Sequence, residues 1–346
     1  MPRKKSSGQL TNRQRALIRA EREARQVRRL ARERVAAGGG IGGGVELGPE
    51  EEGLAISHYG LNAEVEDGEG RRSRCSVRET LEEEPVCGDR VVWRRSGATD
   101  QGVIVVIHPR RSLLQRPGAF ASMKRLAANV DQLLIVTVAP DPNPGLLDRY
   151  LVAAEQAGIT PLVVVNKSDL PHDAASLDQL LGVYRRMGYV TLQVSARTGE
   201  GLQALERVLK DRLSVFVGRS GMGKSALISR WIDFEEVRVG TVHGATGQGR
   251  HTTAVARLYH LPGGGSLIDS PGVRSFALYG VDRGSVARHF RDIAPYLGQC
   301  RFSDCRHRRE PGCAILAASR AGAVDPRRVE SLTRMMDSLD GSHFEG

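Results

Sequence analysis

The stretch LSVFVGRSGMGKSAL, residues 213–227, decides how this chain folds. It opens with an apolar run typical of a buried strand, continues into a loop that matches GxxxxGK[ST], and leads into the helix-like segment Ala226–Trp231. Glycines let backbone N–H groups wrap a phosphate without Cβ clashes. We therefore predict a phosphate-binding loop formed by Gly218, Arg219, Ser220, Gly221, Met222, Gly223, Lys224, Ser225 and Ala226, with Lys224 at the β/γ oxygens and Ser225 on Mg²⁺.

Apolar runs alternate with helix-like segments around this loop. The runs lie at Leu133–Val138, Leu162–Val165, Val190–Val194, Leu213–Val217 and Leu267–Ile268. Continuous apolar strands separated by helices predict a parallel sheet that is covered on both faces. We expect an α/β P-loop domain over residues 126–281.

A second motif, Asn166, Lys167, Ser168 and Asp169, follows one of these runs and matches NKxD. A carboxylate at its last position can accept hydrogen bonds from guanine N1–H and the exocyclic amine, a pair that adenine does not supply. Ser195 and Ala196 end the next run, where a GTPase places a small loop under the base. The motif alone also fits a turn with an N-capping aspartate. Together with the loop, it favours a GTPase over a P-loop ATPase.

The magnesium and switch elements come after the phosphate loop. Asp269 and Gly272 belong to DSPG, which follows an apolar run and can hold Mg²⁺ and contact the γ-phosphate. Thr252 and Thr253 precede it, and either can reach Mg²⁺; we favour Thr252. Because Val273 follows Gly272, no glutamine is placed to orient water, so His251 is the candidate catalytic group together with Thr252 and Lys224. His251 packing in its loop or touching RNA is the alternative.

The order of these motifs is permuted. In Ras-like GTPases the phosphate loop comes first, whereas here the base motif at residue 166 precedes the loop at residue 218. A sheet tolerates such a change if the original ends of the chain lie close together. As a result, the DSPG segment leads directly into the C-terminal region.

That region carries a compact set of metal ligands. Cys300, Cys305, His307 and Cys313 offer three thiolates and one imidazole, a common tetrahedral zinc set. Four protein ligands leave no open position, so we predict one structural Zn²⁺ in a helical domain over residues 282–346. The alternative is three unrelated cysteines near a histidine. The surrounding arginines suit RNA phosphate.

The N-terminal third is expected to hold an arm and a barrel. Residues 1–34 contain twelve Arg or Lys and three Glu, so they carry 12 − 3 = +9 of the formal +10. We expect a basic flexible arm with a glycine linker over residues 1–50, which is either a polyanion-binding segment or a solvated tail. Short β-rich runs predict a β-barrel over residues 51–125, an OB-fold or an SH3-like barrel.

In combination these motifs resemble the bacterial RsgA (YjeQ/EngC) family of circularly permuted GTPases. The resemblance covers about residues 55–335 and rests on GDRVVW at 88–93, PRRSLLQRP at 109–117, AANVDQLLIV at 127–136, NKSDL at 166–170, GRSGMGKS at 218–225, GRHTT at 249–253, DSPGVR at 269–274 and the Cys/His cluster. It implies an N-terminal OB-fold, a permuted GTPase domain and a C-terminal zinc domain. It also implies binding of the 30S subunit and 16S rRNA, and subunit-stimulated hydrolysis of GTP to GDP in late small-subunit maturation.

Two further expectations concern the setting of this activity. The sequence has no apolar run of roughly 18 residues and no secretory signal, so we expect a cytoplasmic protein without a membrane span. A monomer is expected. A regulatory RNA-binding scaffold that scarcely hydrolyses nucleotide is the competing class, against which the intact phosphate, magnesium and base motifs argue.

Overall fold

The computed structural model of this chain describes residues 47–59, 62–78, 81, 83–97, 100–117, 123–232, 256–269 and 283–341. The chain divides into two compact units, residues 1–111 and residues 112–346. His251, Thr252, Thr253 and Gly272 lie outside the described residues, as does the basic stretch before residue 47. The domain limits expected from the sequence, including those at 125/126 and 281/282, stay predictions.

The first unit is a five-stranded barrel. Its strands are β1 (Leu47–Tyr59), β2 (Asn62–Glu66), β3 (Arg72–Val77), β4 (Arg90–Ser96) and β5 (Gln101–Ile107). They pair in the order β1-β2-β3-β5-β4, and β4 pairs back onto β1 to close the barrel. The β3–β5 pair is parallel and the others are antiparallel. A closed five-stranded barrel of this kind is an OB-fold, which resolves the choice that composition left open.

Trp93 fills the centre of the barrel. Its side chain is fully buried among small and β-branched residues of the neighbouring strands. A Cβ added at Gly53 would lie 2.9 Å from the indole ring, and one at Gly102 would lie 2.6 Å from it. These two glycines therefore make room for the ring, because close-packed interiors leave no space for an extra carbon.

The second unit is built on a mostly parallel sheet. A hairpin of β6 (Leu113–Pro117) and β7 (Met123–Ala128) precedes it. The sheet strands are β8 (Gln132–Val138), β9 (Thr160–Asn166), β10 (Val190–Gln193), β11 (Leu213–Val217), β12 (Arg257–His260) and β13 (Ser266–Asp269), in the order β10-β9-β8-β11-β13-β12. The predicted parallel sheet is confirmed for five strands. The short β12, which no apolar run in the sequence predicted, is antiparallel to β13.

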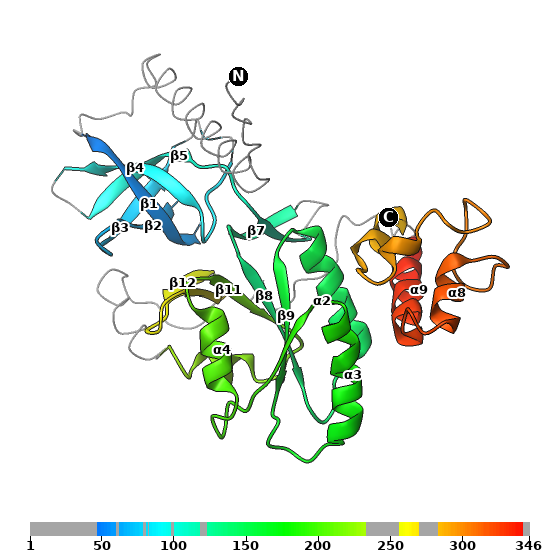
Figure 1. Ribbon diagram of the computed structural model, residues 1–346. Coiled ribbons are helices and arrows are strands. Elements are labelled where there is room, and N and C mark those ends of the chain that lie inside the picture. Colours follow the sequence, from blue (N-terminus) through cyan, green and yellow to red (C-terminus); the bar gives the residue numbers. More distant parts are fainter. Residues whose placement is uncertain are drawn as a thin grey trace, which may run out of the picture. The chain divides into compact units, whose positions relative to one another are not determined.

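Helices cover both faces of this sheet. Helices α2 (Pro144–Gln156) and α3 (Ala174–Arg186) lie side by side on one face, and α4 (Leu202–Leu209) lies on the other (Figure 1). Buried leucines of α4 pack with Leu134 and Val136 of β8. Helix α5 (Lys224–Ile228) follows the phosphate loop. It begins and ends earlier than the predicted Ala226–Trp231 segment.

The C-terminal module, residues 283–341, packs its hydrophobic core against helix α2 of the sheet-containing part of the same unit. It contains α7 (Arg283–Val286), the 3-10 helices η3 (Ala287–His289) and η4 (Ala294–Tyr296), α8 (Ala314–Arg320) and α9 (Pro326–Gly341). Its hydrophobic cluster includes Val152, which belongs to α2 and is fully buried. The module therefore uses α2 as one wall of its own core.

A buried ion network fixes this junction. The Arg328 side chain of α9 is 2% exposed and pairs with Asp148 of α2 and with Asp292 at 3.0 Å. The Tyr184 hydroxyl of α3 donates to the same Asp148 carboxylate at 3.0 Å. Burial opposes the charge on Arg328, but the attraction of Asp148 and Asp292 outweighs it and raises the pKa of the guanidinium. Arg328 also lies 4.4 Å from the centre of the Phe290 ring.

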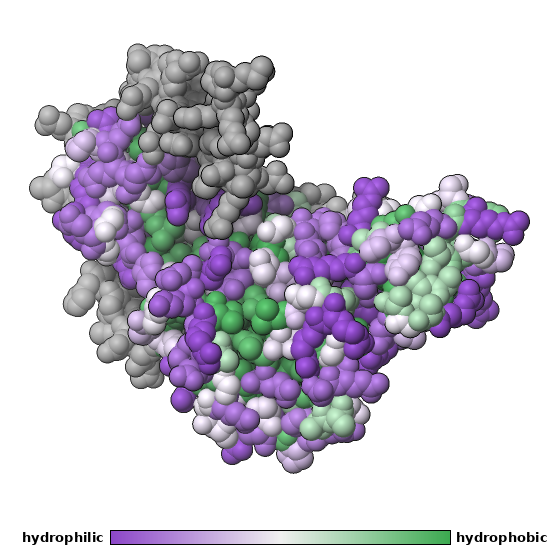
Figure 2. Space-filling view, in the orientation of Figure 1, coloured by the Kyte–Doolittle hydropathy of each residue, from purple (hydrophilic) through white to green (hydrophobic). Residues whose placement is uncertain are grey.

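None of the helices within the described ranges is long and apolar enough to cross a bilayer. Hydrophilic side chains predominate on the face shown in Figure 2.

Removing the buried guanidinium should destabilise the second unit. We expect Arg328→Ala to lower its free energy of unfolding by about 3–5 kcal/mol, because Asp148 is left buried without its cation. Arg334→Ala removes an exposed pair with Glu330 on the same helix and should cost less than about 1 kcal/mol. Urea denaturation followed by circular dichroism measures both. Equal urea midpoints for the two variants would contradict a stabilising role for the buried Arg328 side chain.

Candidate nucleotide site and metal centre

The phosphate loop joins β11 to α5 in a conformation that requires glycine. Gly218 has φ +137° and Gly223 has φ +85°. A Cβ at Gly218 would lie 2.3 Å from the Val136 carbonyl oxygen, and one at Gly223 would lie 2.3 Å from the Asn166 amide nitrogen. The loop is thus pressed against the ends of β8 and β9. Only a backbone without side chains at these two positions fits there.

Lys224 places its charge inside the loop. Its side-chain nitrogen donates to the carbonyl oxygens of Gly218 at 2.6 Å and Arg219 at 2.7 Å, and the residue is 6% exposed. The ammonium group therefore lies against the backbone of the loop that the sequence predicts to bind phosphate.

Asn166 connects three motifs that are far apart in the sequence. Its amide nitrogen donates to the Met222 carbonyl of the phosphate loop at 3.0 Å. Its amide oxygen accepts from the Ala196 backbone N–H at 3.1 Å. The neighbouring Lys167, with φ +59°, donates from its side chain to the Gly221 carbonyl at 2.9 Å. The sheet order β9-β8-β11 brings these strand ends together in spite of the permuted sequence.

Asp169 faces the base side of the same edge. Its two carboxylate oxygens accept from the Ser195 hydroxyl at 2.5 Å and from Arg197 Nε at 2.8 Å. The hydrogen bond from Ser195, followed by that from Arg197, lowers the pKa of Asp169. The Ser195 hydroxyl also accepts from the Thr198 N–H at 3.0 Å, which fixes its orientation. The carboxylate is therefore held in its ionised form, with one oxygen engaged by Ser195 and the other by Arg197.

Of the remaining site residues predicted from the sequence, some lie in the described part of the chain and four lie outside it. Asp269 ends β13, which is parallel to β11, so its backbone lies at the sheet edge that carries the phosphate loop. Ser168 donates its N–H to the Val194 carbonyl at 3.1 Å and thereby ties the base motif to the next strand. Ser220, Ser225 and Ala226 lie in the loop and first turn of α5. His251, Thr252, Thr253 and Gly272 are outside the described part of the chain.

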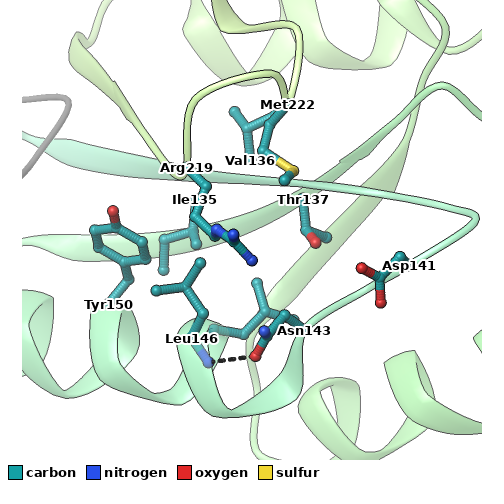
Figure 3. A pocket seen from close by; sticks show the side chains of 10 residues that line it. Ile135, Val136, Thr137, Asp141, Asn143, Leu146, Tyr150, Arg219 and Met222 are labelled. Atoms are coloured by element: carbon teal, nitrogen blue, oxygen red, sulfur yellow. Dashed lines mark hydrogen bonds between the residues drawn. The ribbon is translucent and has the colours of Figure 1, made fainter.

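Helix α2 packs beside the phosphate loop. A cavity of about 10 Å³ separates them, lined by Arg219 and Met222 of the loop and by Leu146 and Tyr150 of α2 (Figure 3). The Tyr150 hydroxyl is hydrogen-bonded to the Gly218 backbone, and burial raises its pKa. Sequence reasoning missed Tyr150. The only available signal, an aromatic residue at a buried helix position, is not specific.

The four predicted metal ligands converge in the C-terminal module. Their donor atoms all lie within 4.8 Å of one another. The Cys300 sulfur is 3.9 Å from the Cys313 sulfur and 3.6 Å from His307 Nδ1, which is 3.4 Å from the Cys313 sulfur. A tetrahedral zinc site with ordinary bond lengths requires about 3.8 Å between sulfurs and about 3.5 Å between sulfur and nitrogen. The residues therefore fit a zinc ion.

Local backbone features hold this ligand loop in shape. Glu310 accepts backbone N–H bonds from Arg308 at 2.8 Å, Arg309 at 3.0 Å and Arg306 at 3.1 Å. These bonds, with its own N–H the largest contributor, lower the pKa of Glu310 to about 2. His307 has φ +60°, a conformation uncommon outside glycine that turns the chain between the ligands. Sequence reasoning missed Glu310 as the group that organises this loop.

Comparisons with known proteins agree with this geometry. The sequence profile of the RsgA GTPase family matches residues 107–279. A protein of Azotobacter vinelandii named small ribosomal subunit biogenesis GTPase RsgA is 49% identical over 338 residues, which are 96% of this chain and 97% of that protein.

Two solved structures have the same fold. YjeQ from Thermotoga maritima gives a TM-score of 0.69 at 29% identity, covering 85% of this chain and 99% of YjeQ. YloQ, described as a circularly permuted GTPase, gives 0.67 at 26% identity, covering 85% of this chain and 96% of YloQ. Taken with the permuted motifs that the sheet brings together and the Cys₃His cluster, these similarities show that the chain belongs to the RsgA GTPase family.

Proposed function

We propose that this GTPase binds guanine nucleotide at the carboxyl ends of β8, β9, β11 and β13, and that it hydrolyses GTP during maturation of the 30S ribosomal subunit. The observation that carries the proposal is Asn166, whose side chain bonds both the phosphate loop and the loop predicted to lie under the base. One side chain thereby sets the distance between the phosphate-binding and base-reading parts.

Each part of the site has a defined task. Asp169 accepts from the guanine edge, and Ala196, whose N–H is bonded to Asn166, lies under the base. Lys224 balances the phosphate charge, while Ser225, Asp269 and Thr252 or Thr253 are the residues that would hold Mg²⁺. When bound, Mg²⁺ neutralises charge that develops on the β/γ oxygens. His251 orients the attacking water, because the residue after Gly272 is apolar.

The partner follows from the family. Its relative in Azotobacter vinelandii is named for small ribosomal subunit biogenesis, and we propose that this chain binds the 30S subunit and its 16S rRNA. The barrel and the arginine-rich C-terminal module supply candidate RNA-binding surfaces. The proposed place of action is the cytoplasm, and the proposed working form is a monomer.

We further propose that Cys300, Cys305, His307 and Cys313 hold one structural Zn²⁺. The four donor atoms lie within 4.8 Å of one another, and three thiolates this close repel one another unless a cation binds between them. Zinc bound there would stabilise the loop between η4 and α8, because all four ligands lie in it or at its ends.

The base assignment predicts a change of nucleotide preference. Asp169→Asn should weaken GTP binding by about 10- to 100-fold and relax exclusion of xanthine nucleotides, because a donor replaces an acceptor. Asp178→Asn, which alters an exposed pair on α3, is the matched control and should bind GTP normally. Fluorescent-nucleotide titration measures both. Unchanged GTP affinity in Asp169→Asn would rule out base reading by this residue.

The metal assignment predicts one zinc per chain. Cys305→Ser should lose the zinc and the local fold of the C-terminal module, since binding and folding of such a site are coupled. Cys75→Ala, at a buried thiol of the barrel, should keep it. Elemental analysis of purified protein gives the stoichiometry. Zinc-free wild-type protein would contradict the proposal.

Subunit-dependent hydrolysis tests the proposed function as a whole. Single-turnover GTP hydrolysis should be faster with 30S subunits than without them. His251→Ala should keep GTP affinity and subunit binding but lose about 100-fold of the stimulated rate, whereas His172→Ala, at an exposed histidine, should behave as wild type. Absence of any stimulation in wild type would overturn the ribosomal role. Normal stimulation in His251→Ala would point to a catalytic group from the subunit.

A further inference from the structure

A hollow in the C-terminal module combines an exposed aromatic ring with unpaired cations. It has a volume of about 780 Å³ and is lined by residues of η3, the turn before Cys300 and the ligand loop. Phe302 lies in its wall and is 43% exposed. Among the described residues, only Phe302 and Tyr59 are exposed aromatic side chains. An exposed ring beside cationic side chains offers a face on which a nucleic-acid base can stack.

Three arginines supply the positive charge of this hollow. Arg288, Arg301 and Arg306 line it and are exposed. Within the described part of the chain, none of the three is paired with a carboxylate. Asp304 is the one acidic side chain in the lining. Glu310 is turned toward the backbone N–H groups of its own loop and does not neutralise these arginines.

The ring and one cation are held together by the fold. The Arg301 guanidinium lies 5.5 Å from the centre of the Phe302 ring. The Arg301 N–H donates to the Gly312 carbonyl at 3.0 Å, and a Cβ at position 312, where φ is +75°, would lie 2.8 Å from Arg301 Cβ. The Phe302 carbonyl accepts from the Cys305 N–H at 3.3 Å. The ligand loop thus positions both residues, one and two positions after the predicted metal ligand Cys300.

We propose that this hollow is a binding site for one unpaired nucleotide of single-stranded RNA, with the base stacked on Phe302 and its phosphates bound by Arg288, Arg301 and Arg306. The choice of RNA as the polyanion rests on the proposed function. An aromatic platform beside arginines is the combination that binds single strands without reading sequence, because every base has a stacking face. A surface that binds phosphate by charge alone would not require an exposed aromatic side chain.

Site-specific cross-linking tests the proposal on the full-length, zinc-containing protein. A short single-stranded RNA carrying 4-thiouridine, irradiated with near-ultraviolet light, should label the peptide that contains Phe302. Phe302→Leu should abolish this cross-link and leave those at other RNA-binding surfaces, while Phe302→Tyr should retain it. Zinc content and GTP affinity should be unchanged in both variants, which excludes unfolding as the cause.

Affinity measurements give the second readout. Phe302→Leu should weaken binding of the same RNA by about tenfold without changing its salt dependence, since stacking and not charge is lost. Arg301→Gln should lower the slope of log affinity against log salt by about one. Equal cross-linking and affinity for wild type and Phe302→Leu would overturn the proposal. So would loss of the cross-link when an acidic peptide, whose own affinity does not depend on Phe302, is added before irradiation.

These outcomes are separate from those that test the ribosomal role. No subunits are present in the binding assay, so a Phe302-dependent cross-link supports the site even if 30S subunits fail to stimulate hydrolysis. Conversely, stimulated hydrolysis with no effect of Phe302→Leu on RNA binding overturns the site alone.

Discussion

The side-chain amide of Asn166 is the contact on which the arrangement of the proposed nucleotide site depends. It holds the Met222 carbonyl with one end and the Ala196 N–H with the other, across gaps of 56 and 30 residues in sequence. Gly223 must lack a side chain because this amide occupies the space beside it. An amide suits the role because it donates and accepts at once. A carboxylate of the same shape would satisfy only one of the two loops.

The permutation leaves this geometry intact because the sheet, and not the chain order, sets the neighbours. Strands β8, β9 and β11 lie side by side in parallel, so their carboxyl ends meet at one edge. Ligands of open α/β sheets bind at such an edge. The permutation changes the connections between strands. Strands β11 and β13 are adjacent in the sheet, although the chain between them includes β12 and the residues predicted to sense the γ-phosphate.

Short sequence motifs predicted which residues lie close together in the fold. The phosphate loop, the NKxD residues and the Cys/His ligands are short motifs, and the structure places the residues of each beside one another. It did not recover Arg328 or Tyr150, since their partners are distant in sequence and an arginine on an amphipathic helix is usually exposed. Strand β12 was missed because four residues of mixed polarity give no periodic signal. The roles of His251 and the threonine pair stay predictions.

The sharing of α2 has a consequence for how this protein can be divided. Val152 belongs to the core of the C-terminal module, and Asp148 forms an ion pair with Arg328, which lies 180 positions further along the chain. A fragment cut before the module would present a bare apolar strip and an uncompensated carboxylate on the same helix. Such a fragment is a different molecule from the intact enzyme, with a surface prone to self-association. Because Asp148 and Arg328 form a direct ion pair across this junction, we expect the effects of substitutions at the two positions on stability to be coupled.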